Sequence, residues 1–492
     1  MTLKTTSLSR PSVHFVGIGG IGISALARWF MAQNWAVTGS DLADSRIIAS
    51  LRKFGARVKI GHSAANLPSK GLNMVIYTSA VPYSNPELIK ARRKGLIPLS
   101  YPETVGCLTK IYRTIAVAGS HGKSTTTALA SLVLIKAKLD PSVILGTNLK
   151  ELGDSNFRKG RSKWLVLEAD EWNASFLNYH PEISIVTNID EEHLDFYKNL
   201  TSVKKTFLKF LGNTKIGGTL ILNKEDKNLR ALKSPIARIA RRRLLNVYWY
   251  ATSRLKVIGY RLQELKKVLR IPGEHNVSNA MAVLTLAKVL KIQKGTSLKA
   301  LGAYVGSWRR FEFRGYLAPV LGIKYQISST GKLPRRKMRD TKFKTPVFDD
   351  YAHHPTEIKA TLQAFREKFP KYKIVCVYQP HQARRLKALF EGFISAFQMA
   401  DFLILLPVYE VAGRDKVIST YSSKRLAEAI FKKYPRKKVF YLANPKRIRA
   451  LVLEILNGSG FNLHDSCVVM MGAGDIVNYT PLLLKGSRGR MG

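Results

Sequence analysis

Three series of alternating strand-like and helix-like segments run along this chain of 492 residues, and they constrain its fold more than any other feature. The first series starts near the N-terminus, the second opens at 114–120, and the third follows a basic loop at 331–346. Such alternation is typical of parallel sheets with crossover helices. The chain is also too long for a single hydrophobic core. We therefore predict an α/β protein with three tandem α/β domains at 1–107, 108–312 and 313–492.

A glycine-rich turn marks the first series. Residues 13–26 read VHFVGIGGIGISAL, in which an apolar run ends in Gly17–Gly22 and a helix-like stretch follows. This G-x-G-x-x-G pattern is typical of a diphosphate site, because backbone N–H groups at a helix start attract phosphate. Asp41 follows the second predicted strand of the series. The motif fits a nicotinamide-dependent oxidoreductase, and it equally fits an enzyme that binds another diphosphate ligand.

A second phosphate-type loop opens the second series. Residues 117–127 read VAGSHGKSTTT, so a strand ends in glycine and Gly122, Lys123 and Ser124 begin a helix. Backbone N–H groups can cradle phosphate there, Lys123 can reach the terminal phosphates, and the Ser124 hydroxyl can bind magnesium. Val117 stands where the eight-residue P-loop consensus requires glycine, so this is a shorter G-x-x-G-K-S loop. The loop predicts a nucleotide triphosphate site.

Acidic side chains and a histidine follow the next two predicted strands: Glu168, Asp170, Glu171, Asp190, Glu191, Glu192 and His193. Ligands of open parallel sheets bind outside the carboxyl ends of the strands, so these side chains should lie at the edge that carries the phosphate loop. Carboxylate oxygens and an imidazole near a nucleotide suggest one or two magnesium ions.

The third series contains two adjacent histidines between a strand and a helix. Asp349 and Asp350 end the predicted strand, His353 and His354 follow, and Pro355 favours the first turn of the helix. Neighbouring side chains point apart on a strand or a helix, so a zinc chelate formed by both histidines is disfavoured.

The charge is strongly basic, with 80 Lys and Arg against 33 Asp and Glu, a net charge of +47. Such a balance suits polyanions. The cations are spread along the whole chain, with local clusters such as those at 241–243 and 332–344. No aromatic–basic RNA motif or recognition helix accompanies them. We expect a general Lys/Arg bias and anionic small substrates, and only non-specific binding of nucleic acid.

Cysteine content and hydropathy indicate the cellular compartment in which the protein acts. Cys107, Cys376 and Cys467 are widely spaced, which fits a reducing compartment without a disulfide framework or a thiolate metal site. No window is apolar for long enough to span a membrane, and the first ten residues do not resemble a signal peptide. These features predict a cytoplasmic protein.

Eight motifs occur in a fixed order between about residues 12 and 480: GIGGIGISALA, GSHGKSTTT, EADE with the following VTNID, HNVSNA, WRRFEF, DDYAHHPTEI, YQPH and MGAGDI. Together they resemble the Mur ligases of peptidoglycan synthesis. The resemblance implies a Rossmann-like N-terminal domain for a UDP-sugar and a central P-loop ATPase-like domain for ATP and Mg²⁺. It also implies a C-terminal Rossmann-like domain that contributes to ATP and amino-acid binding.

The activity implied by this resemblance is ATP-dependent ligation of L-alanine to the lactyl carboxylate of UDP-N-acetylmuramate through an acyl phosphate. A recycling ligase that adds a murein tripeptide to the same sugar nucleotide is the alternative. The resemblance leaves an NAD(P)-dependent oxidoreductase and a nucleic-acid-binding protein as remote alternatives. We expect a monomer or a weak homodimer.

The resemblance also implies roles for individual residues of the central and C-terminal parts. The catalytic set would be Lys123, Glu168, His193, Arg310 and His353. ATP would contact Gly119, Ser120, His121, Gly122, Lys123, Ser124, Thr125, His275, Asn276, Asn279, Arg310 and Asp350. Ser124 and Glu168 would bind the first magnesium, and His193 the second.

Substrate residues are implied in the first and last parts of the chain: Gly19, Gly20, Ile21, Asp41, Ser79, Ala80 and Asn85 for the UDP-sugar, and His354 and Arg385 for the amino acid. Gln382 departs from the pattern, because the alanine ligases usually carry arginine after QPH. Anchoring of the amino acid must then depend on Arg385 or Arg384. Some Mur ligases use a carbamylated lysine, and Lys205 and Lys209 lie in the corresponding region without an assignable role.

Overall fold

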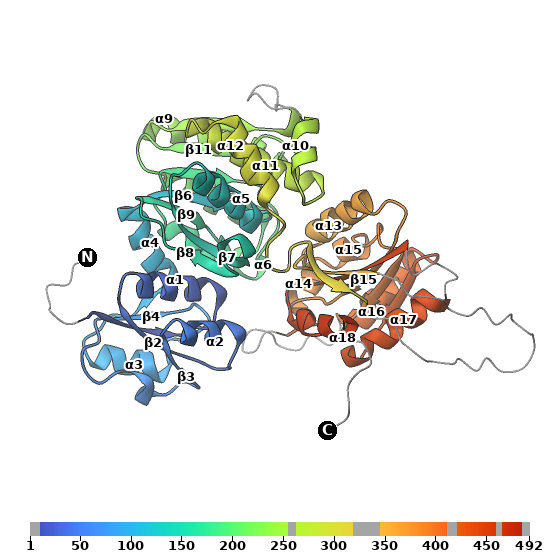
Figure 1. Cartoon of the computed structure of the whole chain (residues 1–492), viewed down its shortest axis with the longest axis horizontal. Helices are drawn as coiled ribbons and strands as arrows, with labels where there is room; N and C mark the ends of the chain where they lie inside the picture. Colours follow the sequence, from blue (N-terminus) through green and yellow to red (C-terminus); the bar gives the residue numbers. More distant parts are fainter. Residues whose placement is uncertain (1–9, 254–261, 318–344, 411–420, 459–464, 485–492) are drawn as a thin grey trace, which may run out of the picture. The chain divides into compact units, whose positions relative to one another are not determined.

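A computed structural model describes residues 10–253, 262–317, 345–410, 421–458 and 465–484. Three separate sheets follow one another along the chain, in the blue, teal-to-green and yellow-to-red parts of Figure 1. The chain divides into two compact units, Met1–Arg270 with His275–Trp308, and Ile271–Glu274 with Arg309–Gly492. The first unit holds two sheets and the second holds one. The basic segment 332–344 lies outside the described residues.

The first sheet has five parallel strands in the order β3-β2-β1-β4-β5. Its strands are β1 (Ser12–Val16), β2 (Ala36–Asp41), β3 (Arg57–Ile60), β4 (Met74–Tyr77) and β5 (Leu99–Ser100). Its helices are α1 (Ile21–Ala32), α2 (Arg46–Lys53), η1 (Ala64–Asn66), α3 (Pro86–Arg93) and α4 (Tyr101–Ile111). The strand order reverses between β1 and β4, which is where ligands bind in open α/β sheets. The turn Gly17–Gly22 follows β1 at this point.

A fully buried carboxylate links the strands and helices of this first sheet. Glu87 accepts hydrogen bonds from Ser40 at 2.8 Å and lies 2.7 Å from Nε2 of His14. Its other oxygen lies 3.1 Å from Nδ1 of His62 and accepts a bond from Asn66. Burial acts to raise the pKa of Glu87, but the bonds to His14 and Ser40 outweigh it and lower the pKa below its usual value. The carboxylate is therefore a stabilising group above that pKa.

The second sheet has seven strands in the order β12-β11-β10-β6-β9-β7-β8, and the pairs are parallel except β7 with β8. Its strands are β6 (Arg113–Ala118), β7 (Ser142–Leu149), β8 (Ser155–Arg158), β9 (Trp164–Glu168), β10 (Ile183–Val186), β11 (Thr219–Asn223) and β12 (Asn246–Tyr250). The helices that follow these strands are α5 (Lys123–Lys136), η2 (Lys150–Leu152), η3 (Trp172–Asn178), α6 (Leu194–Tyr197), α7 (Leu200–Gly212), α8 (Lys227–Ala231), α9 (Lys233–Arg243), α10 (Leu262–Val268), α11 (Glu274–Val289) and α12 (Lys294–Ala303). The central strands are buried on both faces, as continuous apolar runs require.

Helix α1 packs against β7 and β8 and so joins the first two sheets. Asn156 of β8 donates from its side-chain amide to the carbonyl of Ile21 and, at 3.0 Å, to the hydroxyl of Ser24. One continuous apolar core includes side chains of both sheets. The helix that follows the first glycine turn is thereby fixed to the central sheet.

The third sheet has six strands in the order β13-β14-β18-β15-β16-β17, and only β13 runs antiparallel to its neighbour. Its strands are β13 (Glu312–Tyr316), β14 (Pro346–Asp350), β15 (Lys373–Tyr378), β16 (Phe402–Leu405), β17 (Lys438–Tyr441) and β18 (Ser466–Met471). Its helices are α13 (Pro355–Lys368), α14 (Ala383–Ala388), α15 (Phe390–Ile394), α16 (Ser423–Lys433), η5 (Pro445–Arg447), α17 (Ile448–Gly458), η7 (Asp475–Asn478) and α18 (Thr480–Leu484). Alternate residues of β15 enter two separate cores, one on each face of the sheet.

The prediction of a three-part α/β fold is confirmed. The boundaries at 107/108 and 312/313 stay predictions. Among the described residues, every helix is too short or too polar to cross a bilayer.

Candidate active site

The loop between β6 and α5 requires glycine at two positions. Gly119 has a φ of 141°, and a Cβ there would lie 2.0 Å from Oγ1 of Thr187. Gly122 has a φ of 82°, and its Cβ would lie 2.5 Å from the side-chain oxygen of Asn279. Other residues would be strained at both positions and would collide with their neighbours. The GSHGKS spacing therefore follows from backbone geometry.

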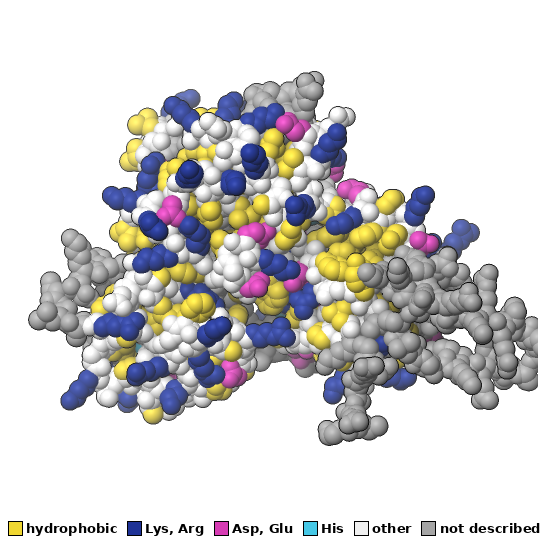
Figure 2. All heavy atoms as spheres, in the orientation of Figure 1, with side chains coloured by type: hydrophobic (Ala, Val, Ile, Leu, Met, Phe, Trp, Pro, Cys, Tyr) yellow, Lys and Arg dark blue, Asp and Glu magenta, His cyan; other side chains and the backbone are white. Residues whose placement is uncertain are grey.

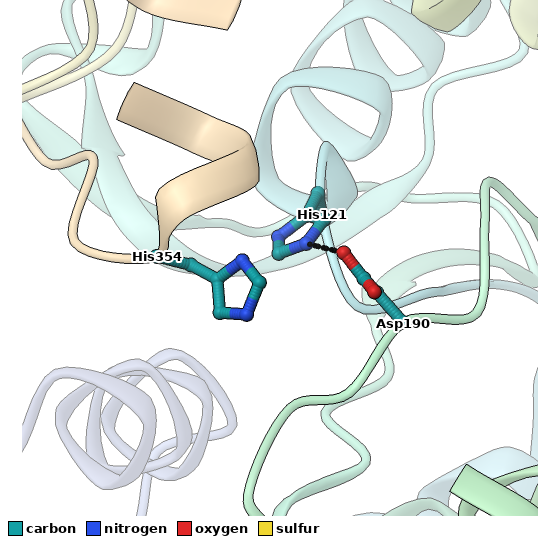
Figure 3. A group of neighbouring side chains, drawn as sticks. All are labelled: His121, Asp190 and His354. Atoms are coloured by element: carbon teal, nitrogen blue, oxygen red, sulfur yellow. Dashed lines mark hydrogen bonds and ion pairs between the residues drawn. The ribbon is translucent and has the colours of Figure 1, made fainter. Parts of the chain in front are cut away.

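The loop after β10 holds this glycine loop in place. The His121 N–H donates to the side-chain oxygen of Asn188 at 2.8 Å, and the Thr187 hydroxyl donates to the His121 carbonyl at 2.6 Å. Figure 3 shows the pairing of the His121 ring with Asp190, at 3.0 Å between Nε2 and Oδ2. His354, labelled in the same view, belongs to the second unit. The first N–H groups of α5 have no acceptor within the helix and remain suited to an anion.

Lys123 is held by the loop itself and by a buried carboxylate. Its ammonium donates to the Gly119 carbonyl at 2.7 Å and to Oε2 of Glu171 at 2.8 Å. Burial acts to lower the pKa of Lys123, but Glu171 and Asp170 outweigh it and raise the pKa. Burial raises the pKa of Glu171, and the charge of Lys123 opposes the rise. The ammonium is thus kept charged at the loop.

Glu168, the last residue of β9, faces the start of α5. One carboxylate oxygen accepts from the Ser124 hydroxyl at 2.8 Å, and the other accepts from the Gly146 N–H at 2.8 Å. A Cβ on Gly146 would lie 2.9 Å from both oxygens of Glu168. The hydroxyl and the carboxylate predicted to share a magnesium ion are therefore adjacent.

His193 lies with a different pair of acids. Ligand atoms of Asp170, Glu171 and His193 all lie within 4.8 Å of one another, and Nε2 of His193 is 3.8 Å from Oε1 of Glu171. Oε1 of Glu171 is buried and has no hydrogen-bond partner within the part of the chain that the structure describes. A hard cation with oxygen and imidazole ligands suits this arrangement.

The HNVSNA motif begins α11 and lies against the phosphate loop. Asn276 and Asn279 are buried, and the Asn279 amide donates to the Asn276 oxygen at 3.3 Å. Asn279 is the residue that a side chain on Gly122 would meet. His275 is half-buried at the start of the helix.

The glycine turn of the first sheet carries a carboxylate of its own. The Gly19 N–H donates to Oδ2 of Asp41 at 2.8 Å, while Gly17 and Ile18 donate to the Ser40 carbonyl. Tyr101, at the start of α4, lies beside this turn, because a Cβ on Gly22 would be 3.2 Å from its ring. Burial and then Glu168 and Asp170 raise the pKa of Tyr101. Tyr101 thus lies within electrostatic range of the Glu168 carboxylate.

Two other predicted substrate positions follow β4. Asn85 is buried and caps α3 by accepting from the Glu87 N–H at 2.9 Å. Ser79 is half-buried and Ala80 is exposed in the loop before it.

In the second unit, Asp350 ends β14 and fixes the residues that follow Trp308. It accepts from the Phe311 N–H at 2.8 Å and from the Ala352 N–H at 2.9 Å. Arg310 is half-buried, with its guanidinium carbon 5.5 Å from the centre of the Tyr351 ring.

Arg309 has a structural role that the sequence did not indicate. It is buried, donates to the Gly472 carbonyl, and donates at 2.9 Å to the Gly474 carbonyl. The MGAGDI loop is thereby tied to the WRRF segment.

Imidazoles and an arginine gather near the carboxyl ends of β14 and β15. Nδ1 of His353 lies 3.3 Å from Glu357, and its ring centre lies 6.1 Å from that of His381. Arg385 reaches Nδ1 of His381 at 3.2 Å, and the His381 ring stacks on Tyr409. His354 caps α13, because its Nδ1 accepts from the Thr356 N–H at 3.2 Å. Gln382 has a φ of 67° and occupies the N-cap position before α14.

Three family models cover most of the chain: "Mur ligase family, catalytic domain" at 12–113, "Mur ligase middle domain" at 117–287, and "Mur ligase, glutamate ligase domain" at 335–474. Two curated relatives, both named UDP-N-acetylmuramate–L-alanine ligase, match almost end to end. The protein of Clostridium acetobutylicum is 34% identical, with 96% of this chain and 97% of the relative covered. The protein of a Sulfurihydrogenibium species is 35% identical, with the same coverage of each chain. The chain belongs to the Mur ligase family.

A solved Mur ligase structure agrees with this assignment. The UDP-N-acetylmuramate–alanine ligase of Thermotoga maritima superposes with a TM-score of 0.71 at 26% identity, covering 96% of this chain and 98% of that one.

The predicted site residues of this Mur ligase form three groups, two in the first unit and one in the second. One group of the first unit is the glycine turn with Asp41. The first unit brings together Gly119–Thr125, Glu168, His193, Asn276 and Asn279 around the phosphate loop. The second unit brings Asp350 to the WRRF segment, and His353 to His381, the neighbour of Arg385. Sequence reasoning named Glu171 only within a group of acids, since spacing along the chain does not show which carboxylate reaches a lysine 48 residues away.

Proposed function

We propose that this Mur ligase uses ATP to join L-alanine to the lactyl carboxylate of UDP-N-acetylmuramate, releasing ADP and phosphate. The observation that carries this proposal is the near end-to-end match to relatives that bear the name of this activity. The phosphate loop with Lys123, and Glu168 bonded to Ser124, supply the groups that ATP chemistry requires.

The reaction proceeds in two balanced steps. A carboxylate is a poor electrophile, so an oxygen of the lactyl carboxylate first attacks the γ-phosphorus and ADP leaves. The amine of L-alanine then attacks the carbonyl carbon of this acyl phosphate, loses a proton, and displaces phosphate. Because the phosphoryl group carries most of the charge, catalysis depends on positioning and on neutralising that charge.

Lys123 is the group that neutralises phosphate charge in the first unit. In the structure its ammonium bonds to the loop carbonyls and to Glu171, so it is charged and already directed at the loop. The N–H groups of the first turn of α5, which have no acceptor within the helix, donate hydrogen bonds to the phosphate oxygens. Asn279 lies against Gly122 of the loop, and its side-chain amide donates to Asn276. Arg310, Asp350 and His275 are the remaining ATP contacts that we propose.

Mg²⁺ fits the oxygen-rich part of this group. Ser124 and Glu168 would hold one ion, and His193 with Asp170 and Glu171 would hold a second, since Oε1 of Glu171 is buried without a hydrogen-bond partner in the described chain. When bound, the metal supplies positive charge to the phosphate oxygens.

The sugar nucleotide and the amino acid use the other predicted residues. The pyrophosphate of the sugar nucleotide binds at Gly19, Gly20 and Ile21. There it accepts the hydrogen bond that the Gly19 N–H donates to Asp41 in this structure. Ser79, Ala80 and Asn85 line the binding site of the sugar nucleotide. In the second unit, His353, His354 and Arg385 bind L-alanine. We expect the enzyme to act in the cytoplasm as a monomer or weak homodimer.

A phosphate-release assay with different acceptors tests the proposal. Purified protein receives UDP-N-acetylmuramate, ATP and MgCl₂ with L-alanine, glycine, L-serine or murein tripeptide. We expect fastest release with L-alanine and none when any component is omitted. Faster release with the tripeptide would establish the recycling reaction instead, and release without the sugar nucleotide would refute both.

A further inference from the structure

Three exposed aliphatic side chains lie at the amino edge of the second sheet, opposite the phosphate loop. Ile111 is 59% exposed, Ile216 is 71% exposed and Leu244 is 73% exposed. They lie two or three residues before β6, β11 and β12, which run parallel in the strand order β12-β11-β10-β6. With strands roughly 4.8 Å apart, the amino ends of β6 and β12 lie about 14 Å apart, and the three side chains lie along this stretch of the edge. We call these residues the aliphatic row.

Hydrogen bonds hold the segments of the row together. The Gly217 N–H donates to the Arg243 carbonyl at 3.0 Å, and Nε of Arg243 donates to the Thr214 carbonyl at 2.9 Å. Nζ of Lys215 donates to the Tyr112 carbonyl at 2.9 Å. These contacts place the turn before β11 against the ends of both α9 and α4. The aliphatic row is therefore a fixed feature of the surface.

The row is surrounded by cations. The segments 110–113, 161–163, 180–182, 213–218 and 241–246 precede five neighbouring strands of the sheet. They contain Lys110, Arg113, Arg161, Lys163, Lys215, Arg241, Arg242 and Arg243. Their acidic residue is Glu182, which already accepts from Arg113 at 2.6 Å. Asp140, which precedes β7 at the same edge, already accepts from Arg158 and from the Arg161 N–H. Burial, and then Lys110, Lys215 and Arg243, lower the pKa of His180, as expected for a positive local potential.

We propose that this amino edge is a docking surface for a bilayer that contains anionic phospholipid. Lys and Arg are scattered over the whole of the face drawn in Figure 2, so charge alone does not single out an edge. The amino edge combines cations with protruding aliphatic side chains. Cations near an anionic leaflet and apolar side chains buried at the acyl boundary stabilise peripheral binding together.

The same features disfavour other partners. A second copy would bring two cationic edges together, and like charges oppose that contact. Nucleic acids use aromatic side chains for stacking, whereas Ile111, Ile216 and Leu244 are aliphatic. Protein hot spots are anchors in desolvated pockets, whereas these Ile and Leu side chains protrude from the surface.

Docking through this edge leaves the catalytic group accessible. The phosphate loop follows the carboxyl end of β6, and Ile111 precedes its amino end, so the two features lie at opposite edges of one sheet. The proposal is independent of the proposed ligase reaction, and purified enzyme should work without lipid.

Vesicle co-sedimentation of the full chain at physiological ionic strength tests the surface. We expect binding to vesicles of phosphatidylcholine mixed with phosphatidylglycerol, and little binding to phosphatidylcholine alone. The variant Ile111→Asn/Ile216→Asn/Leu244→Asn should lose roughly ten-fold or more in affinity. Asn suits the φ of 55° at Leu244, so this change should not disturb the backbone there.

Matched controls separate the amino edge from the general charge. Ile97→Asn, at an 83% exposed position of the first sheet's domain, should leave vesicle binding unchanged. Arg241→Gln/Arg242→Gln should weaken vesicle binding about 25-fold, at about five-fold per cation. Lys432→Gln/Lys446→Gln, a charge pair away from the amino edge, should weaken it less. Equal effects of the two charge pairs, or unchanged binding by the triple variant, would overturn the proposal. Failure of the native protein to bind the mixed vesicles, with or without binding to RNA, would also overturn it.

Discussion

Replacing Gly119 by alanine is the sharpest perturbation of the phosphate loop. Gly119 has a φ of 141°, and its Cβ would lie 2.0 Å from Oγ1 of Thr187, where ordinary contacts begin at 3.4 Å. It would also lie 3.2 Å from both the backbone nitrogen and the backbone oxygen of Asn188. The added methyl group must therefore displace the loop after β10, which pairs with the phosphate loop.

The expected loss in the free energy of unfolding of Gly119→Ala has two parts. A non-glycine residue in this backbone region costs roughly 1–2 kcal/mol. Overpacking against the Thr187 and Asn188 segment adds roughly 1–3 kcal/mol. Gly153→Ala is the matched control, because Gly153 has a φ of 74° and open space around it. We expect a total of about 2–5 kcal/mol at Gly119 and about 1–2 kcal/mol at Gly153.

Hydrogen exchange of the amides in 113–136, followed by mass spectrometry, measures the local free energy of opening. Calorimetric titration with a non-hydrolysable ATP analogue measures binding. Gly119→Ala should destabilise this segment and weaken nucleotide binding at least roughly ten-fold, because the N–H groups move from their positions. Gly153→Ala should leave binding unchanged. Equal nucleotide affinity of the two variants would refute the assignment of 119–124 as the phosphate loop.

Three further predictions concern buried charge. Lys123→Ala should reduce turnover at least about 100-fold while UDP-sugar affinity, measured by titration calorimetry, stays unchanged; loss of both would contradict separate sites. Breaking the Lys123–Glu171 pair from either side should lower the free energy of opening by about 3–5 kcal/mol in the hydrogen-exchange assay. Lys123→Met/Glu171→Gln should lower it by less than the two single changes combined. Strict additivity would contradict a buried pair. Because the folded pKa of Glu87 lies below its usual 4.5, its stabilisation is present above that pH and is lost as pH falls through the folded pKa. Glu87→Gln should therefore flatten the acid limb of thermal unfolding, and an unchanged acid limb would contradict the role of this carboxylate.

The parts of the fold that depend on local pattern were predictable from the sequence. Alternating apolar and helical segments predicted the three α/β series. Because the carboxyl ends of parallel strands lie at one edge of a sheet, Glu168 was predicted to lie near the phosphate loop. The structure brings Glu168 to the Ser124 hydroxyl. Both predictions needed only strand direction and the order of segments along the chain.

Direct contacts between distant segments were not predictable from local pattern and spacing, although the family resemblance placed some of these residues at the same ligand. Asn279 lies against Gly122 although more than 150 residues separate them, and spacing carries no information on such packing. Arg309 and Arg310 are adjacent in the sequence, and only tertiary structure shows that Arg309 is buried on the Gly472 and Gly474 carbonyls. The hydrogen bond from Gly19 to Asp41 likewise depends on how β2 ends beside the turn.

Transfer of oxygen from substrate to phosphate tests the proposed chemistry most directly. UDP-N-acetylmuramate labelled with ¹⁸O in both lactyl carboxylate oxygens is incubated with the enzyme, ATP, MgCl₂ and L-alanine, and the released phosphate is analysed by mass spectrometry. An acyl phosphate requires that each phosphate carry one ¹⁸O atom, while the amide retains the other. Unlabelled phosphate, formed together with the L-alanine product, would contradict the proposed reaction.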